Sequence, residues 1–126
     1  MSFPTDRKYS ESHEWFLVEG DIVTMGISQH AADELTDITY VDVPDVGSSV
    51  TAGETIGEVE SVKATSEILS AVSGEVVEVN AALVDHPEMI NEDAYEDGWI
   101  VRIKAESIDP IKALMDAKEY EASIPS

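Results

Sequence analysis

A single lysine, Lys63, is the residue best placed to carry chemistry in this chain. It is one of seven basic residues among 27 acidic ones, and it lies between two strand-like segments, 54–62 and 64–72. A lysine at the tip of a β-hairpin is exposed, long and flexible, which suits the covalent attachment of a cofactor arm. Turn tips are usually polar for structural reasons alone. The spacing by itself therefore favours an ordinary surface lysine.

The other reactive side chains do not form a recognisable site. The chain has no cysteine, which excludes disulfides, thiolate metal sites and a cysteine nucleophile. Three histidines, His13, His30 and His86, are scattered, and none follows His13 at the spacing of a zinc-protease helix. Residues 91–97 are acidic but lack the ligand spacing of a calcium loop. With no phosphate-binding glycine loop or serine nucleophile elbow, the sequence predicts neither a metal site nor an enzyme.

Composition limits the class of protein and its partners. With 126 residues, 43% of them hydrophobic, the chain predicts one domain spanning residues 1–126. Its net charge of −20 would repel nucleic acids and anionic membranes. The acidic residues are spread along the whole chain, which favours a solvated surface suited to high salt. No apolar run follows the charges near the start, so a cytoplasmic location is expected.

The elements expected around Lys63 are mostly short strands. Alternating or β-branched runs predict strands at residues 15–18, 22–25, 37–43, 75–80 and 99–104, in addition to the two arms of the Lys63 hairpin. Ser28 should cap a helix over residues 29–35, Asn80 a helical turn at 81–85, and Asp109 a C-terminal helix at about 109–118. Residues 86–98 are expected to form a loop. The pattern indicates a small β-sandwich or barrel with peripheral helices.

Several sequence blocks, in order, resemble one known family. The blocks are Ser-His-Glu-Trp at 12–15, Gly-Ile-Ser-Gln-His-Ala at 26–31, Val-Pro-Asp-Val-Gly at 43–47, Glu-Ser-Val-Lys-Ala-Thr-Ser at 60–66, Val-Ser-Gly-Glu-Val-Val-Glu-Val-Asn at 72–80, Tyr-Glu-Asp-Gly-Trp at 95–99 and Lys-Glu-Tyr at 118–120. Together they make residues 9–120 similar to the H-protein family of the glycine cleavage system. The resemblance implies a mainly β fold, the barrel-sandwich hybrid of lipoyl and biotinyl carriers, with the lysine on a β-hairpin turn.

The resemblance also implies a cofactor and a set of partners. In that family the lysine matching Lys63 carries lipoate in amide linkage. The lipoyl group accepts the aminomethyl group from a pyridoxal-phosphate glycine decarboxylase. A tetrahydrofolate-dependent aminomethyltransferase removes that group, and an FAD-containing dihydrolipoyl dehydrogenase reoxidises the lipoate. The chain would thus be a non-enzymatic carrier, which agrees with its lack of a catalytic constellation.

Two further groups of residues take their roles from the resemblance. The context read by the lipoylating enzyme would be Glu60, Ser61, Val62, Ala64 and Glu67. Ser12, Glu14 and His30 match positions near the family's lipoyl cleft. There Glu14 could hold the cationic aminomethyl group by a charge-assisted hydrogen bond, with Ser12 beside it. Ser12 and Glu14 could equally do no more than shape the entry to the first strand, and His30 could be an ordinary helix residue.

The chain departs from the family pattern at Glu67, Ala71 and Thr36, where Asp, Pro and Gly are common. Thr36 leaves open whether the first helix ends in the usual left-handed geometry. Alternative functions also remain open. A lipoate-relay protein would carry lipoate on the same lysine without handling glycine. A biotin carrier would have methionines beside the lysine, where this chain has Val62 and Ala64.

Overall fold

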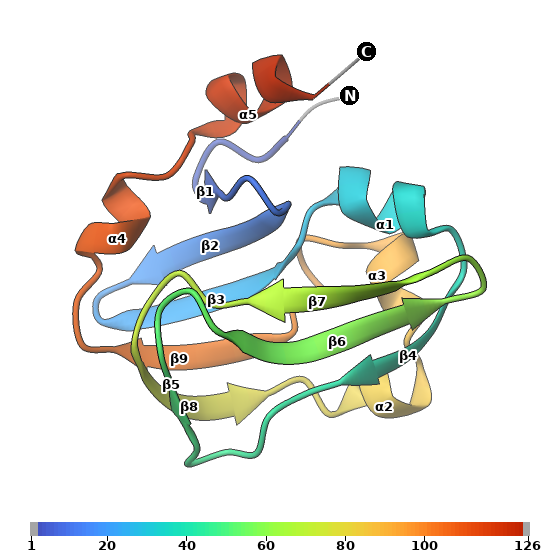
Figure 1. The fold of residues 1–126 in the computed structure, drawn as a ribbon, viewed down its shortest axis with the longest axis horizontal. Helices are drawn as coiled ribbons and strands as arrows, with labels where there is room; N and C mark the ends of the chain where they lie inside the picture. Colours follow the sequence, from blue (N-terminus) through green and yellow to red (C-terminus); the bar gives the residue numbers. More distant parts are fainter. Residues whose placement is uncertain (1–2, 125–126) are drawn as a thin grey trace.

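The computed structural model describes residues 3–124 and consists of two antiparallel β-sheets with short helices (Figure 1). The six-stranded sheet has the order β1-β2-β3-β9-β8-β5, and the three-stranded sheet has the order β4-β6-β7. The strands are β1 (Lys8–Tyr9), β2 (Glu14–Glu19), β3 (Ile22–Ile27), β4 (Ile38–Asp42), β5 (Ser49–Val50), β6 (Thr55–Ser61), β7 (Thr65–Leu69), β8 (Gly74–Val79) and β9 (Val101–Ala105). The expected mainly β fold is confirmed.

The main hydrophobic core contains side chains from both sheets. In β9, Val101 and Ile103 are fully buried while Arg102 and Lys104 face outward, as their alternation predicts. The alternation of the predicted strand at 99–104 would place Trp99 inward with them, but Trp99 is half-buried and belongs to a second cluster around Trp15. There the Arg102 guanidinium stacks over the Trp99 ring at 4.0 Å. The cation keeps this indole near the surface.

The described part of the chain has five short helices beside the sheets: α1 (Gln29–Leu35), α2 (Ala82–Asp85), α3 (Met89–Glu92), α4 (Asp109–Lys112) and α5 (Ala117–Ser123). Ser28 caps α1 as predicted, because its Oγ accepts a hydrogen bond from the Ala31 N–H at 3.1 Å. The predicted Asn80 cap is wrong. The Asn80 side chain instead donates to the carbonyls of Asp97 and Trp99, both at 2.8 Å. Asn80 therefore fixes the start of β9 and leaves α2 without a side-chain cap.

The loop expected at residues 86–98 contains α3. Its Ile90 is fully buried, and the neighbouring Asn91 supplies tertiary hydrogen bonds. The Asn91 amide donates to the Thr36 carbonyl at 2.6 Å, and its Oδ1 accepts from the Ile38 N–H at 2.9 Å. These contacts hold α3 against the end of α1 and the start of β4. Packing thus orders a stretch whose acidic composition suggested a loop.

The C-terminal helix predicted at about residues 109–118 is wrong in extent. Met115 forms a bridge with Tyr9 of β1, with N–H···O distances of 2.8 and 3.0 Å in the two directions. This bridge requires extended backbone, so α4 ends at Lys112. Asp116 then begins α5 with a capping box to Glu119. Asp109 is the first residue of α4 and not its cap, because Ile108 occupies the cap position.

Thr36 ends α1 with a positive φ of 63°, but its ψ of −139° lies outside the usual left-handed helical region. Only glycine adopts this combination without strain. We expect Thr36→Gly to raise the free energy of unfolding by about 1 kcal/mol, despite the loss of the 2.6 Å bond from Thr36 Oγ1 to the Leu35 carbonyl. Urea denaturation would measure it. The control is Thr39→Gly in β4, which should destabilise the protein, and a loss at both positions would contradict the prediction.

The outer face of the three-stranded sheet carries a row of like charges. Asp42 is paired directly with Glu58, and Glu58 with Glu67. Carboxylates opposite one another on one face destabilise a sheet. We expect Glu58→Gln to stabilise the protein by about 0.5 kcal/mol at low ionic strength, with the gain vanishing in molar KCl, where screening is strong. Thermal melts at both salt concentrations would test this. As a control, Glu11→Gln in an exposed turn should change the melting temperature little at either salt concentration.

Candidate functional site

The tip of the β6–β7 hairpin is held by the side chain and backbone of Ser61. Its backbone N–H donates to the Ala64 carbonyl at 2.8 Å. Its Oγ accepts from the N–H groups of Lys63 at 3.1 Å and Ala64 at 3.0 Å. The Val62 N–H donates to the Asp37 carbonyl at 3.1 Å, which ties the tip to the chain before β4. The backbone around Lys63 is therefore fixed on both sides.

Lys63 itself is exposed, and its amine lies against the end of α1. Its Nζ donates to the Glu34 carbonyl at 3.2 Å. Among residues 3–124 no ion pair involves Lys63. In Figure 1 the tip between β6 and β7 projects from the three-stranded sheet beside the chain that leaves α1. The amine is thus exposed at the surface, while the backbone of the tip stays in place.

Glu60 and Glu67 flank the tip without contacting the lysine. Both face outward on the three-stranded sheet, where Glu60 is paired with Tyr40 and Thr65. Glu67 accepts a hydrogen bond from Thr55 Oγ1 at 3.1 Å. Tyr40, exposed by 50%, is a large uncovered side chain on this face. The surface beside Lys63 is consequently acidic and carries one aromatic ring.

Glu14 is a buried carboxylate that joins the two sheets. It is only 1% exposed, although it begins β2. Its Oε1 accepts hydrogen bonds from Ser10 Oγ at 2.6 Å and from Ser12 Oγ. Its Oε2 accepts from the backbone N–H of Leu69, the last residue of β7, at 3.2 Å. Glu14 therefore binds the strand that follows Lys63 to the larger sheet.

Burial raises the pKa of Glu14, and the hydrogen bonds from Ser10, Ser12 and Leu69 partly oppose that rise. No ion pair between residues 3 and 124 neutralises this carboxylate. It lines a cavity of about 320 Å³, whose other walls include Gly53, Leu69 and Leu114. A cationic group in this cavity would favour the ionised form of Glu14. The arrangement can hold a small amine against an otherwise largely apolar wall.

His30 lies in a different cluster from Ser12 and Glu14. Its ring centroid is 5.1 Å from that of His13, and the His13 Nδ1 is 2.7 Å from the Tyr120 hydroxyl. The same hydroxyl is 2.7 Å from Ser28 Oγ. Burial lowers the pKa of His13, and the neighbouring His30 lowers it further. His30 is absent from the walls of the Glu14 cavity, and the cluster instead joins α5 to α1.

Sequence reasoning identified Ser12 and Glu14 but missed Ser10. Two serines just before Glu14, in the turn between β1 and β2, are a usable signal, because serine hydroxyls in turns hydrogen-bond to groups nearby in the chain. Pro110 and Leu114, which also line the cavity, had no such signal. They reach it only through the packing of α4 and the segment after it. No group of three metal-binding side chains occurs in residues 3–124. None of the described helices is long and apolar enough to cross a membrane.

Two antiparallel sheets with an exposed lysine at a fixed hairpin tip define the carrier-domain class, the barrel-sandwich hybrid of lipoyl-type carriers. The comparisons with known proteins identify the family. The family model described as "Glycine cleavage H-protein" matches residues 7–126. The glycine cleavage system H protein of Acinetobacter baumannii is 52% identical over 124 residues, covering 98% of this chain and all of the relative. That of Geobacillus kaustophilus is 47% identical, with 98% of each chain covered.

A solved structure agrees with these sequence relatives. The crystal structure of a glycine cleavage system H protein from Mycobacterium marinum has a TM-score of 0.87 and 39% identity, covering 95% of this chain and 97% of that one. The chain belongs to the glycine cleavage H-protein family, whose members are the lipoyl carriers of that system.

Proposed function

We propose that Lys63 carries lipoate in amide linkage and that the chain is a non-enzymatic carrier. The observation that supports this is the exposed Lys63 amine on a tip whose backbone is fixed by Ser61 and Asp37. The residues fit the cofactor, because the amine lacks an ion-pair partner among residues 3–124 and is open to acylation. When bound, lipoate supplies a disulfide that accepts the aminomethyl group. Ser61, Val62 and Ala64 set the tip conformation that the lipoylating enzyme would read.

The proposed partners follow from the family role. They are the pyridoxal-phosphate glycine decarboxylase, the tetrahydrofolate-dependent aminomethyltransferase, the FAD-containing dihydrolipoyl dehydrogenase and the lipoylating enzyme. We propose that these reactions take place in the cytoplasm and involve no nucleic acid or membrane partner. The acidic residues Glu60 and Glu67 would help the lipoylating enzyme accept this lysine and reject others, because they distinguish the surface around it.

The test is an intact mass measurement with peptide mapping of protein purified from its own host. We expect one lipoyl group, on the peptide that contains Lys63. Its absence there would overturn the carrier assignment. Glycine decarboxylation with the matched decarboxylase then separates this function from that of a lipoate relay, because a relay protein would be lipoylated without supporting the reaction.

The cavity beside Glu14 supports a further part of the proposal, that Glu14 holds the carried aminomethyl group through its ammonium. Ser10 and Ser12 orient the carboxylate for that contact. Hydrogen bonds to charged groups contribute about 1.5–3 kcal/mol. We therefore expect Glu14→Ala to shorten the lifetime of the loaded protein at least about tenfold.

Release of an isotope-labelled aminomethyl group from the loaded protein would measure this lifetime. The control is Glu11→Ala, which removes an exposed carboxylate from the same turn. Equal lifetimes in wild type and Glu14→Ala would show that Glu14 is only a structural link between β2 and β7. Urea denaturation of Glu14→Ala shows whether the variant stays folded, which separates a loss of aminomethyl binding from a loss of stability.

A further inference from the structure

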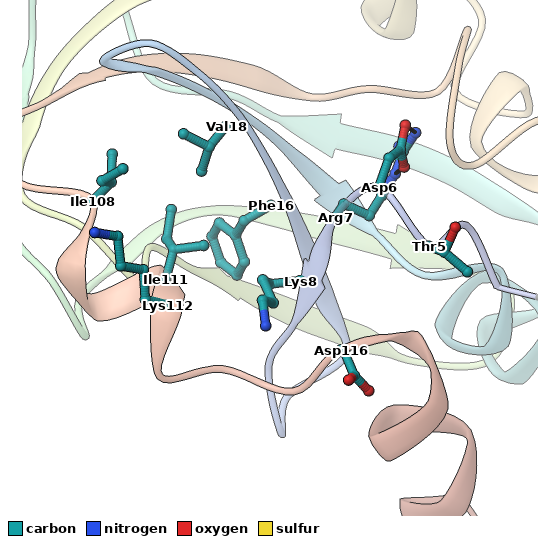
Figure 2. A pocket seen from close by; sticks show the side chains of 10 residues that line it. All are labelled: Thr5, Asp6, Arg7, Lys8, Phe16, Val18, Ile108, Ile111, Lys112 and Asp116. Atoms are coloured by element: carbon teal, nitrogen blue, oxygen red, sulfur yellow. Dashed lines mark hydrogen bonds and ion pairs between the residues drawn. The ribbon is translucent and has the colours of Figure 1, made fainter.

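A second groove lies on the far side of α4 from the Glu14 cavity, with a volume of about 340 Å³. Figure 2 shows Lys8 and Lys112 on either side of Phe16 and Ile111. Val18 and Ile108 extend this apolar floor, and both are only partly buried. The groove therefore combines an apolar strip with two ammonium groups.

Two lysines at one groove are notable on this surface, because the chain has seven basic and 27 acidic residues. Both arginines are already engaged. Arg7 is paired with Asp6 and stacked on Trp15, and Arg102 is paired with Glu78. Lys112 makes an exposed 3.6 Å ion pair with Asp109, which contributes little to stability. Lys8 takes part in no ion pair within residues 3–124. Two cations at this groove are thus available to a ligand.

The acids that border the groove are occupied within the fold. Asp6 accepts from Arg7 Nε at 2.8 Å, and Asp116 accepts from the Glu119 N–H at 2.8 Å as the cap of α5. Asp6 and Arg7 neutralise each other, whereas the hydrogen bond to Asp116 leaves its charge in place. With Lys8 and Lys112, the lining has three cations and two acids, a net charge of +1. A complementary ligand would bring a carboxylate to the lysines and an apolar side chain to the floor.

We propose that this groove docks a segment of another glycine cleavage protein that carries an acidic residue next to an apolar one. The groove is partly open to solvent, which suits a peptide segment better than a small molecule, because small-molecule sites bury most of their ligand. The inference rests on the proposed carrier function for the identity of the partner, but it does not need Lys63 to be modified.

The position of the groove gives the docking a consequence for the carrier site. Phe16 lines both this groove and the Glu14 cavity. Ile108, Ile111 and Lys112 face the groove, whereas Pro110 and Leu114 face the cavity. A segment seated in the groove therefore presses on one side of α4 while the Glu14 cavity lies on the other. A partner bound here is placed to change the shape of that cavity.

The test compares Lys8→Glu/Lys112→Glu with Lys104→Glu/Lys118→Glu, two exposed lysines away from the groove that give the same charge change. Each pair is made in the Lys63→Arg protein, so that the result does not depend on lipoylation. Binding to the purified decarboxylase, aminomethyltransferase and dihydrolipoyl dehydrogenase is measured at low salt. We expect the groove variant to lose at least about tenfold in affinity for one of the three, and the control to lose much less.

Carbodiimide cross-linking of the wild-type complex gives an independent readout, because it joins lysine amines to partner carboxylates. We expect cross-links from Lys8 and Lys112 to one acidic segment. Equal affinities in the two variants, or cross-links only from other lysines, would overturn the proposal. So would self-association of the chain that the groove variant abolishes, since the occupant would then be a second copy.

Discussion

Lys63→Arg is expected to reduce glycine cleavage to background. Arginine keeps the charge and nearly the length of the side chain, but its guanidinium stays protonated and cannot form the lipoyl amide. Stability should change little, because Lys63 is exposed and its side chain makes one hydrogen bond, to the Glu34 carbonyl, that a guanidinium can also donate. The measurement is glycine decarboxylation in the system reconstituted from the matched proteins, together with the intact mass of the carrier.

Lys104→Arg is the matched control, because it makes the same change at an exposed lysine in β9. It should retain the lipoyl mass and full activity. A Lys63→Arg protein that keeps both would show that another lysine carries the cofactor. If Lys63→Arg lost activity but kept a lipoyl group, Lys63 would be needed for a step other than lipoate attachment.

Gly57→Ala is expected to lower the stability of the protein strongly. A Cβ at Gly57 in β6 would lie 2.2 Å from the Asp42 carbonyl oxygen, a backbone atom of the neighbouring strand that cannot move without separating β4 from β6. Overpacking of this kind costs typically 1–3 kcal/mol and more where backbone must shift, so we expect about 3 kcal/mol or more. Urea denaturation would measure the loss.

Gly47→Ala is the control for the loss of glycine itself. Gly47 has φ +93° and nothing within 4 Å of its added Cβ, so the substitution tests backbone strain without a clash. We expect a loss of about 1 kcal/mol there. Similar losses of stability at Gly57 and Gly47 would mean that β4 and β6 move apart more easily than the distances indicate. In that case the hairpin of Lys63 would be held mainly by its tip and by Glu14.

Two hairpins could be predicted because their sequence pattern is local, whereas the pairing of distant strands, such as β3 with β9, could not. The hairpin around Lys63, the β2–β3 hairpin and the Ser28 cap follow from alternation, turn residues and one hydroxyl. The C-terminal helix could not be predicted correctly, because its interruption depends on Tyr9, which is far away in the chain. Asn80 was misassigned for the same reason, since its amide bonds to residues 97 and 99 and not to the helix beside it.

The sequence alone determined the family resemblance and the position of Lys63, because turn chemistry and ordered motifs are properties of neighbouring residues. Only the tertiary structure decided which side chains share a cavity. Glu14 meets Leu69, and α4 divides two cavities that both contain Phe16, through contacts between distant segments. Burial then changes the chemistry of Glu14. Its carboxylate would be solvated in an extended chain, but in the fold it is buried and has no cationic partner among residues 3–124.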